Sequence, residues 1–224
     1  MNFRYPVFLD LTGKKCVVTG EGLEIAAKLE GLYKASAKVV YVHPAAETRI
    51  QEMAATGMIS WEQRDLRADD LEDCFLVVTD REDNSRIFAL AEARNVLCNA
   101  VDDPSHCRFT FGSVHRQGDL TIAISTNGRA PALAVRLRQW IEQNIGPEYG
   151  SLLEIMKRVR PEINDAIPDF SARRELWYGI VDSEVLSLLR DGQTSEAHAQ
   201  IRRMIDEALS NISHSRISSD NDNQ

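Results

Sequence analysis

The sequence predicts an α/β fold, in which a mostly parallel sheet covered by helices is followed by a small strand-containing region and an all-helical C-terminal part. Three observations lead to this prediction. Strand-like and helix-like patterns alternate as far as residue 101, a glycine turn joins the first strand to the first helix, and only helical periodicity follows Gly146-Pro147. Alternating strands and helices give parallel strands, because each helix returns the chain across a face of the sheet.

The predicted sheet is made of runs rich in β-branched and other apolar residues. We expect its strands over 14–19, 38–42, 58–63, 74–80 and 96–101, with the third at an edge. The helices expected between them cover 26–34, 48–57 and 84–94, and Asp83 or Asn84 can cap the last of these. The run 74–80 is apolar until its final two residues, so we expect a strand that is buried on both faces.

The second half of the chain is expected to form a hairpin and then helices. Two strand-like runs, 109–115 and 120–125, flank a turn at 116–119, and helices are expected at 132–144, 149–163, 171–182, 183–190 and 195–210. The apolar stripes of these helices are typical of a core or a subunit contact. The last segment is polar, so we divide the chain into 1–112, 113–147, 148–213 and a disordered tail at 214–224.

The chain is acidic, with 34 Asp and Glu against 26 Lys and Arg and a formal charge of −8. No general positive field would attract phosphates, which argues against bulk affinity for nucleic acid or an anionic membrane. The four cysteines are scattered without a CxxC pair, so we expect buried thiols and no metal site. The sequence shows neither a secretion signal nor an apolar run long enough to span a membrane, and we expect a cytoplasmic protein.

The turn after the first strand is Gly20-Glu-Gly22, and a helical pattern follows it directly. Glycines let the backbone approach a pyrophosphate, which the free N–H groups at the helix N-terminus then bind, as in Rossmann-like domains. The third small position of the dinucleotide motif is Ile25, however, and His43-Pro44 after the second strand offers neither an acid for the ribose nor an Arg for a 2′-phosphate. On these residues alone, a turn without a ligand is an equally good interpretation.

Two acids, Asp102 and Asp103, directly follow the fifth apolar run and precede Pro104. Ligands of open α/β sheets bind at the carboxyl ends of the strands, so we expect these carboxylates at the mouth of a cleft. Thr79 and Asp80 end the preceding strand and are expected at the same edge. Taken alone, Asp-Asp-Pro is also ordinary turn chemistry.

A second polar cluster, Ser125-Thr-Asn-Gly128, stands between the last predicted strand and the helix that Pro131 opens. Its hydroxyl and backbone N–H groups can bind an anion or cap the helix, and the two roles are not exclusive. Arg129 follows the cluster, and Arg116 lies in the turn before it.

Several of these segments together resemble one family. They are Tyr5-Pro-Val-Phe-Leu-Asp-Leu11, Gly20-Glu-Gly22, Val77-Val-Thr-Asp80 with Asn84, Cys98-Asn-Ala-Val-Asp102, the run from Gly118 to Gly128, and Pro131-Ala-Leu-Ala134. From about residue 5 to 145 the chain is similar to the precorrin-2 dehydrogenases of siroheme synthesis and to the N-terminal dehydrogenase-ferrochelatase part of the siroheme synthases.

The resemblance implies NAD-dependent oxidation of precorrin-2 to sirohydrochlorin, followed in some members by insertion of Fe²⁺ to give siroheme. It also implies a homodimer. From the acidic charge of the chain, we expect neither a nucleic acid nor a membrane as partner. In these terms 1–112 is the NAD-binding domain, 113–147 the dimerisation and substrate-cleft region, and 148–213 a helical domain. The sequence leaves open whether this chain inserts iron itself.

The resemblance also assigns roles by position. It gives the catalytic role to Asp102, and it gives cofactor contacts to Gly20, Gly22, Leu23, Glu24, Pro44, Ala45, Thr79 and Asp80. Ser125 and Thr126 match a hydroxyl loop near the tetrapyrrole. Because that substrate carries carboxylates that Arg binds in a two-pronged fork, we add the neighbouring polar and basic residues as substrate contacts. These are Asn127, Gly128, Arg129 and Arg116, with Arg136 and Arg138 as further candidates.

Asp102 is the expected base, since oxidation of the macrocycle removes a hydride and a proton. The chain departs from the family at Glu21, where a third glycine is usual, and at Ile25, where a small residue is usual. Two other interpretations therefore stay open. One is a nucleotide-sensing regulatory dimer without chemistry, and the other is a scaffold that binds tetrapyrrole without turning it over.

Overall fold

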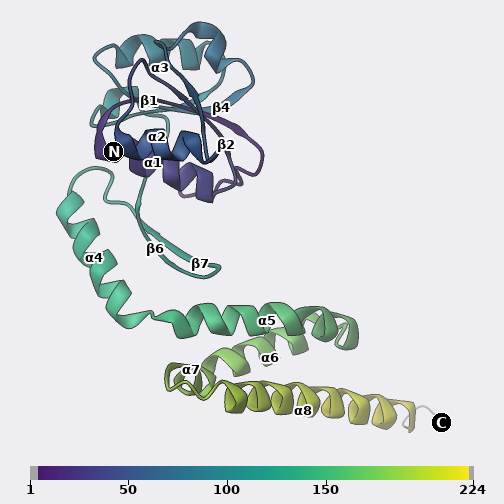
Figure 1. Ribbon diagram of the computed structural model, residues 1–224. Coiled ribbons are helices and arrows are strands. Elements are labelled where there is room, and N and C mark those ends of the chain that lie inside the picture. The colour runs from purple at the N-terminus through teal and green to yellow at the C-terminus, as the bar shows by residue number, and fades with distance from the viewer. Residues whose placement is uncertain (1–4, 222–224) are drawn as a thin grey trace. The chain divides into compact units, whose positions relative to one another are not determined.

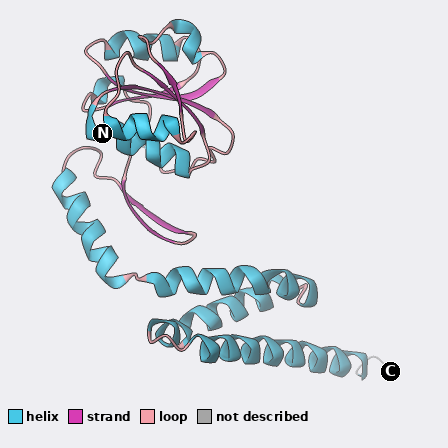
Figure 2. Ribbon diagram, in the orientation of Figure 1, coloured by secondary structure: helices cyan, strands magenta, loops and turns pink. Residues whose placement is uncertain are grey.

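The computed structural model describes residues 5–221 and consists of two compact units, Met1–Phe111 and Gly112–Gln224. Each unit is described by itself. The first contains a parallel sheet with helices on both faces, and the second contains a two-stranded hairpin followed by helices (Figures 1 and 2). The predicted fold class is confirmed.

The sheet of the first unit has the strand order β3-β2-β1-β4-β5, and every neighbouring pair is parallel. Its strands are β1 (Lys15–Gly20), β2 (Lys38–Val42), β3 (Ser60–Glu62), β4 (Cys74–Asp80) and β5 (Leu97–Ala100). The short β3 lies at an edge, as predicted. Strands β2 and β3 follow β1 on one side, and β4 and β5 then lie on its other side. The strand order therefore reverses between β1 and β4, and open α/β sheets bind their ligands at such a point.

Two hydrophobic cores cover the two faces of this sheet, because successive side chains of a strand point to opposite faces. In β1, Cys16 and Val18 belong to the core under α1 (Gly22–Lys34) and α2 (Thr48–Ala55). Val17 belongs to the core under α3 (Asn84–Glu92), which lies on the other face (Figure 1). Burial raises the pKa of the Cys16 thiol to about 12, so this cysteine packs as a small apolar residue.

Helix α3 begins where the sequence predicts, but neither candidate caps it in the expected way. Asp83 occupies the N-cap position and makes no side-chain cap hydrogen bond. The Asn84 side chain turns toward the sheet, where its Oδ1 accepts hydrogen bonds from Thr79 Oγ1 at 2.8 Å and from the Arg81 N–H at 3.1 Å. The Asn84 amide therefore ties the end of β4 to the start of α3. Two short 3₁₀ turns, at Ala68–Leu71 and Pro104–His106, complete this unit.

The second unit begins with the antiparallel hairpin of β6 (Ser113–Gln117) and β7 (Leu120–Ile124). The first of these strands was predicted four residues too early. Phe109 and Phe111 do not pair as strand residues: their rings contact each other edge to face at 5.3 Å, and Asn99 Nδ2 donates to the Phe109 carbonyl at 2.9 Å. These contacts attach the segment to the first unit, so the hairpin begins only at Ser113.

Helices make up the rest of the second unit. They are α4 (Pro131–Asn144), α5 (Pro147–Ala166), α6 (Phe170–Asp182), α7 (Val185–Arg190) and α8 (Thr194–Asn221). Their predicted apolar stripes meet in one core, to which α5 contributes Ile163, α6 Ile180 and α8 Ile201, all at most 1% exposed. At the hairpin turn, a Cβ on Gly118 would stand 3.4 Å from the Cα of Gly150, so a close backbone approach joins the hairpin to α5.

Helix α8 continues to Asn221, into the segment from 214 for which the polar composition predicts disorder. The backbone bonds of a helix propagate past the last apolar contact, because each added residue costs less than nucleation. Disorder of the tail stays a prediction, and 222–224 lie outside the described residues. Within the described range 5–221, none of the helices combines the length and the apolar character needed to cross a membrane.

Candidate active site at the carboxyl edge of the sheet

The tips of β1 and β4 meet at Gly20 and Asp80, which are paired in register. Gly20 has a φ of +127°, and a Cβ at this position would stand 2.8 Å from both the Cβ and the carbonyl oxygen of Asp80. Only glycine satisfies both the backbone conformation and the space. The first glycine of the turn therefore allows the chain to leave β1 close against the tip of β4.

The second glycine of the turn faces open space. Gly22 has a φ of +90°, and a Cβ built on it would meet nothing within 4 Å. It begins α1, and Glu21 at the N-cap makes no side-chain cap hydrogen bond, so no side chain at the N-cap occupies the first N–H groups of the helix. Unblocked N–H groups beside a glycine cradle fit a pyrophosphate, because the dipole of the helix also favours negative charge there.

The residue that departs from the motif does not obstruct this cradle. Ile25 is fully buried in the core between α1 and the sheet. Leu23 is 77% exposed, and the exposed Glu24 forms an ion pair with Lys28 at 3.1 Å. The turn therefore has room for a dinucleotide despite the larger third residue.

The loop after β2 is bonded to the glycine turn by a residue that the sequence analysis did not single out. The buried Tyr41 hydroxyl lies 2.7 Å from the Gly20 carbonyl and 3.2 Å from the Ala45 carbonyl, both of which accept its proton. Burial, followed by the charges of Glu21 and Glu47, raises the pKa of Tyr41 to about 12. Tyr41 thus stays a hydrogen-bond donor, and it holds the exposed Pro44 and Ala45 beside the turn. Its only signal in the sequence is a tyrosine within an aliphatic strand.

The two predicted residues at the tip of β4 differ in access. Thr79 is 0% exposed, and its hydroxyl donates to Asn84. It therefore stabilises this edge of the sheet and is not accessible from the surface. The Asp80 carboxyl is exposed. Partial burial raises its pKa above the ordinary 3.8, and the charges of Glu24 and Asp102 raise it further. Asp80 is therefore a second acid beside the predicted catalytic residue.

Asp102 follows β5 on this same edge. Its φ of +52° lies in the left-handed region, and its side chain is exposed. The Val101 N–H donates to the Thr79 carbonyl at 2.8 Å, and the Asp103 N–H donates to the Ala100 carbonyl at 3.3 Å, so the turn is anchored on both sides of Asp102. The neighbouring Asp103 pairs with His106 at 2.6 Å, whereas Asp102 has no ion-pair partner among residues 5–211, whose side chains the structure describes.

The predicted substrate residues belong to the second unit. Asn127 and Gly128 both have positive φ, and the loop is closed by the Asn127 N–H donating to Ser125 Oγ at 3.2 Å and the Ala130 N–H donating to Thr126 Oγ1 at 3.3 Å. The N-cap residue of α4, Ala130, makes no side-chain cap hydrogen bond, and Thr126 bonds to its backbone N–H. Arg129 and Arg116 are exposed. Of the two further candidates, Arg138 already pairs with Glu142 and Arg136 donates to Gln139.

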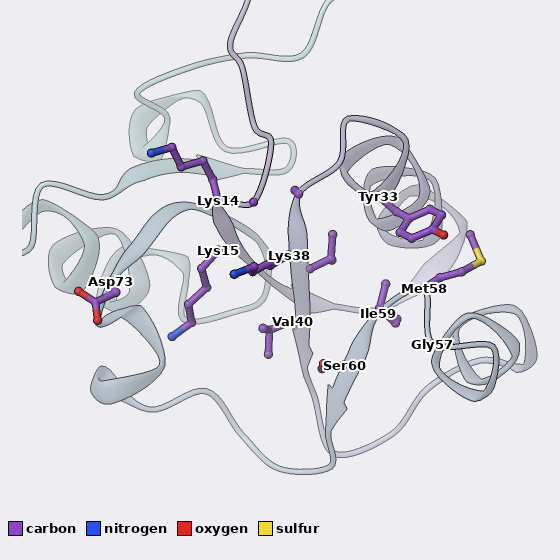
Figure 3. Close-up of a pocket in the computed structure, with 13 residues that line it drawn as sticks. Lys14, Lys15, Tyr33, Lys38, Val40, Gly57, Met58, Ile59, Ser60 and Asp73 are labelled. Carbon is purple, nitrogen blue, oxygen red and sulfur yellow. The ribbon is translucent and has the colours of Figure 1, made fainter.

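A hollow in the first unit lies at the opposite edge of the sheet, at the amino ends of the strands. It measures about 760 Å³, with Lys14, Lys15 and Lys38 on one side and Tyr33 and Met58 on the other (Figure 3). None of the predicted site residues lines it. The glycine turn and the carboxylates share the carboxyl edge instead, where the fold places ligands.

Three family models match successive parts of the chain. Residues 7–113 match a putative NAD(P)-binding family, 117–144 a central region of sirohaem biosynthesis proteins, and 148–205 a sirohaem synthase dimerisation region. Among curated proteins, the chain is 34% identical over 203 residues to the siroheme synthase of Pseudoalteromonas translucida and 30% identical over 205 residues to siroheme synthase 1 of Serratia proteamaculans. The chain resembles the siroheme synthases.

This siroheme synthase resemblance covers 89% and 90% of the chain, which in turn spans 43% of each relative, less than half of its length. Among solved structures, the precorrin-2 dehydrogenase SirC matches with a TM-score of 0.71 at 22% identity, covering 91% of this chain and 100% of that one. The likeness to SirC shows a shared fold. The family match at 7–113 indicates a nicotinamide dinucleotide as the cofactor class and does not distinguish NAD from NADP.

Proposed function

We propose that this protein oxidises precorrin-2 to sirohydrochlorin with NAD as hydride acceptor, within siroheme synthesis. The observation that carries the proposal is the position of Asp102, an exposed carboxylate beside Asp80 on the sheet edge that also holds the glycine turn. The reaction and the substrate are proposed by analogy with the siroheme synthases and the precorrin-2 dehydrogenase SirC that the chain resembles. We keep the cytoplasmic location as a prediction.

The proposed reaction removes one hydride and one proton from the macrocycle and forms one C=C or C=N bond. Bound NAD supplies the hydride acceptor. Asp102 accepts the proton from the reacting carbon or pyrrole nitrogen, and its carboxylate is exposed and in no ion pair with residues 5–211. Gly20 and Gly22 position the pyrophosphate at the start of α1, while Tyr41 holds the loop of Pro44 and Ala45 that contacts the nucleotide.

In the second unit, we propose that Ser125, Thr126, Asn127 and Gly128 bind substrate through hydroxyl and backbone N–H groups. Two residues in left-handed conformation turn the backbone there. Arg129 and Arg116 bind carboxylates of the tetrapyrrole, which the otherwise acidic chain does not attract at long range. Iron insertion would require a base for two pyrrole protons, and Asp102 is our assignment for that step as well, with Fe²⁺ as substrate.

We propose that the protein is a homodimer. The match to a dimerisation region at 148–205 supports this assembly. So does the surface of α6, where Phe170 and Tyr178 are 68% and 62% exposed and lie two turns apart on one face with Val181. The sequence predicts the dimer contact within 113–147, and the match to a dimerisation region supports a contribution from the helices at 148–205 as well. Light scattering of wild type and of Phe170→Ser/Tyr178→Ser measures the contribution of α6 to the dimer.

The function is tested by incubating the protein with precorrin-2 and NAD while following the absorption of the macrocycle and of NADH. A precorrin-2 dehydrogenase forms sirohydrochlorin and NADH in equal amounts. A regulatory dimer binds NAD without forming either product, and a tetrapyrrole scaffold changes the spectrum on binding without forming NADH. Adding Fe²⁺ to the completed reaction distinguishes a dehydrogenase from a dehydrogenase-ferrochelatase, since only the latter then forms siroheme.

A further inference from the structure

The acid that is missing at the tip of β2 is present nearby on another element. Dinucleotide-binding domains that use NAD carry an Asp or Glu about 20 residues after the glycine turn, where it binds the adenosine ribose. Here β2 ends in His43-Pro44 instead. Glu21, between the two glycines, extends its side chain toward this tip, and its Oε1 lies 3.3 Å from His43 Nε2.

His43 has a fixed position at the end of β2. Its side chain is 4% exposed, and its Nδ1 lies 2.7 Å from the Ala45 carbonyl. The imidazole stacks on the Tyr41 ring at 5.9 Å, and Trp61 Nε1 donates to the His43 carbonyl at 2.9 Å. The ring contacts and the backbone bond together fix where His43 Nε2 lies. The Glu21 carboxylate 3.3 Å from it therefore lies at the end of β2, although 73% of its own side chain is exposed.

The alternative role for Glu21 is to cap α1, and the structure argues against it. Glu21 occupies the N-cap position with extended backbone, φ −130° and ψ 170°, yet makes no side-chain cap hydrogen bond. Arg81 is the cation that lowers the pKa of Tyr41, which places it near this loop, and it already pairs with Asp65 at 3.0 Å. Near the end of β2 there is therefore an exposed carboxylate that does not cap the helix, and a cation that is already paired with another acid.

We propose that Glu21 replaces the missing strand-tip acid. Its carboxylate accepts hydrogen bonds from the two hydroxyl groups of the adenosine ribose and repels a 2′-phosphate, so the protein selects NAD over NADP. The inference rests on the proposed dinucleotide site and adds the specificity of that site. It also accounts for the departure from a three-glycine turn, because the middle residue then performs a function that glycine cannot.

The test is the dissociation constant for NAD and for NADP, measured by isothermal titration calorimetry without tetrapyrrole. Wild type should bind NAD more tightly. Glu21→Gln should weaken NAD binding and strengthen NADP binding. The dissociation constant for NADP divided by that for NAD should therefore fall by about tenfold or more, since charge-assisted hydrogen bonds are the stronger ones. Glu21→Gly, which removes the side chain, should change the ratio in the same direction.

Glu47→Gln is the matched control, because Glu47 is likewise an exposed carboxylate at a helix N-cap, that of α2 after the β2 loop, and makes no side-chain cap bond. It should leave the ratio within about twofold. An unchanged ratio in both Glu21 variants, with NAD still bound, overturns the inference and leaves the proposed function standing. If wild type binds neither nucleotide at millimolar concentration, the proposed function and the inference both fail.

Discussion

The carboxylates of Asp80 and Asp102 lie at one edge of the sheet, close enough for the charge of Asp102 to raise the pKa of Asp80. Partial burial raises that pKa above 3.8, the charge of Glu24 raises it further, and the charge of Asp102 adds to both. Two acids that come from β4 and from the turn after β5 therefore act on each other at the site proposed for hydride and proton removal. This relationship leads to the first prediction.

Asp102→Asn should lower the pKa of Asp80 toward its ordinary 3.8, because the substitution removes a neighbouring negative charge. The measurement is an NMR titration of the Asp80 carboxyl carbon. Asp103→Asn is the control, since Asp103 pairs with His106 and its charge does not contribute to the shift. An Asp80 titration that is identical in wild type and Asp102→Asn would show that the two carboxylates are not neighbours.

Alanine at Gly20 should mainly reduce stability, whereas alanine at Gly22 should mainly weaken NAD binding. Gly20→Ala places a Cβ against Asp80 at 2.8 Å in a left-handed backbone, so we expect a loss of about 2 kcal/mol or more in the free energy of unfolding. Gly22→Ala meets nothing within 4 Å, so it should cost only about 1 kcal/mol while weakening NAD binding by filling the cradle. Denaturant unfolding and calorimetry measure the two effects. Equal stability losses with unchanged NAD binding would contradict both roles.

The pair of Asp70 and Arg64 should make stability depend on pH. The Arg64 guanidinium, bonded to both Asp70 oxygens at 2.8 and 2.7 Å, lowers the pKa of Asp70 below 3.8. A lowered pKa gives stability that is present above the unfolded pKa and is lost as the pH falls through the folded one. Asp70→Asn should therefore cost about 1–2 kcal/mol at neutral pH and nothing in strong acid.

Urea unfolding at both pH values measures this difference. Asp69→Asn, the exposed neighbour in the same 3₁₀ turn, should change the free energy of unfolding by less than about 0.5 kcal/mol at either pH. A loss in Asp70→Asn that is the same at neutral and acid pH would mean that the ion pair is not its source.

Arg129→Ala should raise KM for the tetrapyrrole by about five- to tenfold and leave KM for NAD nearly unchanged, because a guanidinium fork binds carboxylates of the macrocycle. Arg138→Ala is the comparison on the following helix. Its guanidinium already pairs with Glu142, so the rise in KM should be smaller. Equal increases in both Michaelis constants for Arg129→Ala would remove Arg129 from the substrate site.

The sequence predicted the sheet, its edge strand and the polar tips of its strands, because hydrophobic periodicity determines which residues are buried and where each strand ends. It did not predict the contact between Glu21 and His43, since no local pattern brings together side chains 22 positions apart. Thr79 shows the same limit: its position at a strand tip was predictable, but its burial under Asn84 depends on packing. The shifted start of β6 follows from aromatic contacts of Phe109 that periodicity does not encode.

The central claim is that Asp102 is the base for precorrin-2 oxidation, and a single-turnover experiment tests it most directly. Wild type and Asp102→Asn are each mixed with precorrin-2 and saturating NAD, and formation of NADH is followed. We predict that the variant folds, binds NAD within about twofold of wild type, and forms NADH about 10²–10⁴ times more slowly, the range expected for loss of a positioned base. Formation of NADH by Asp102→Asn at the wild-type rate would contradict the account.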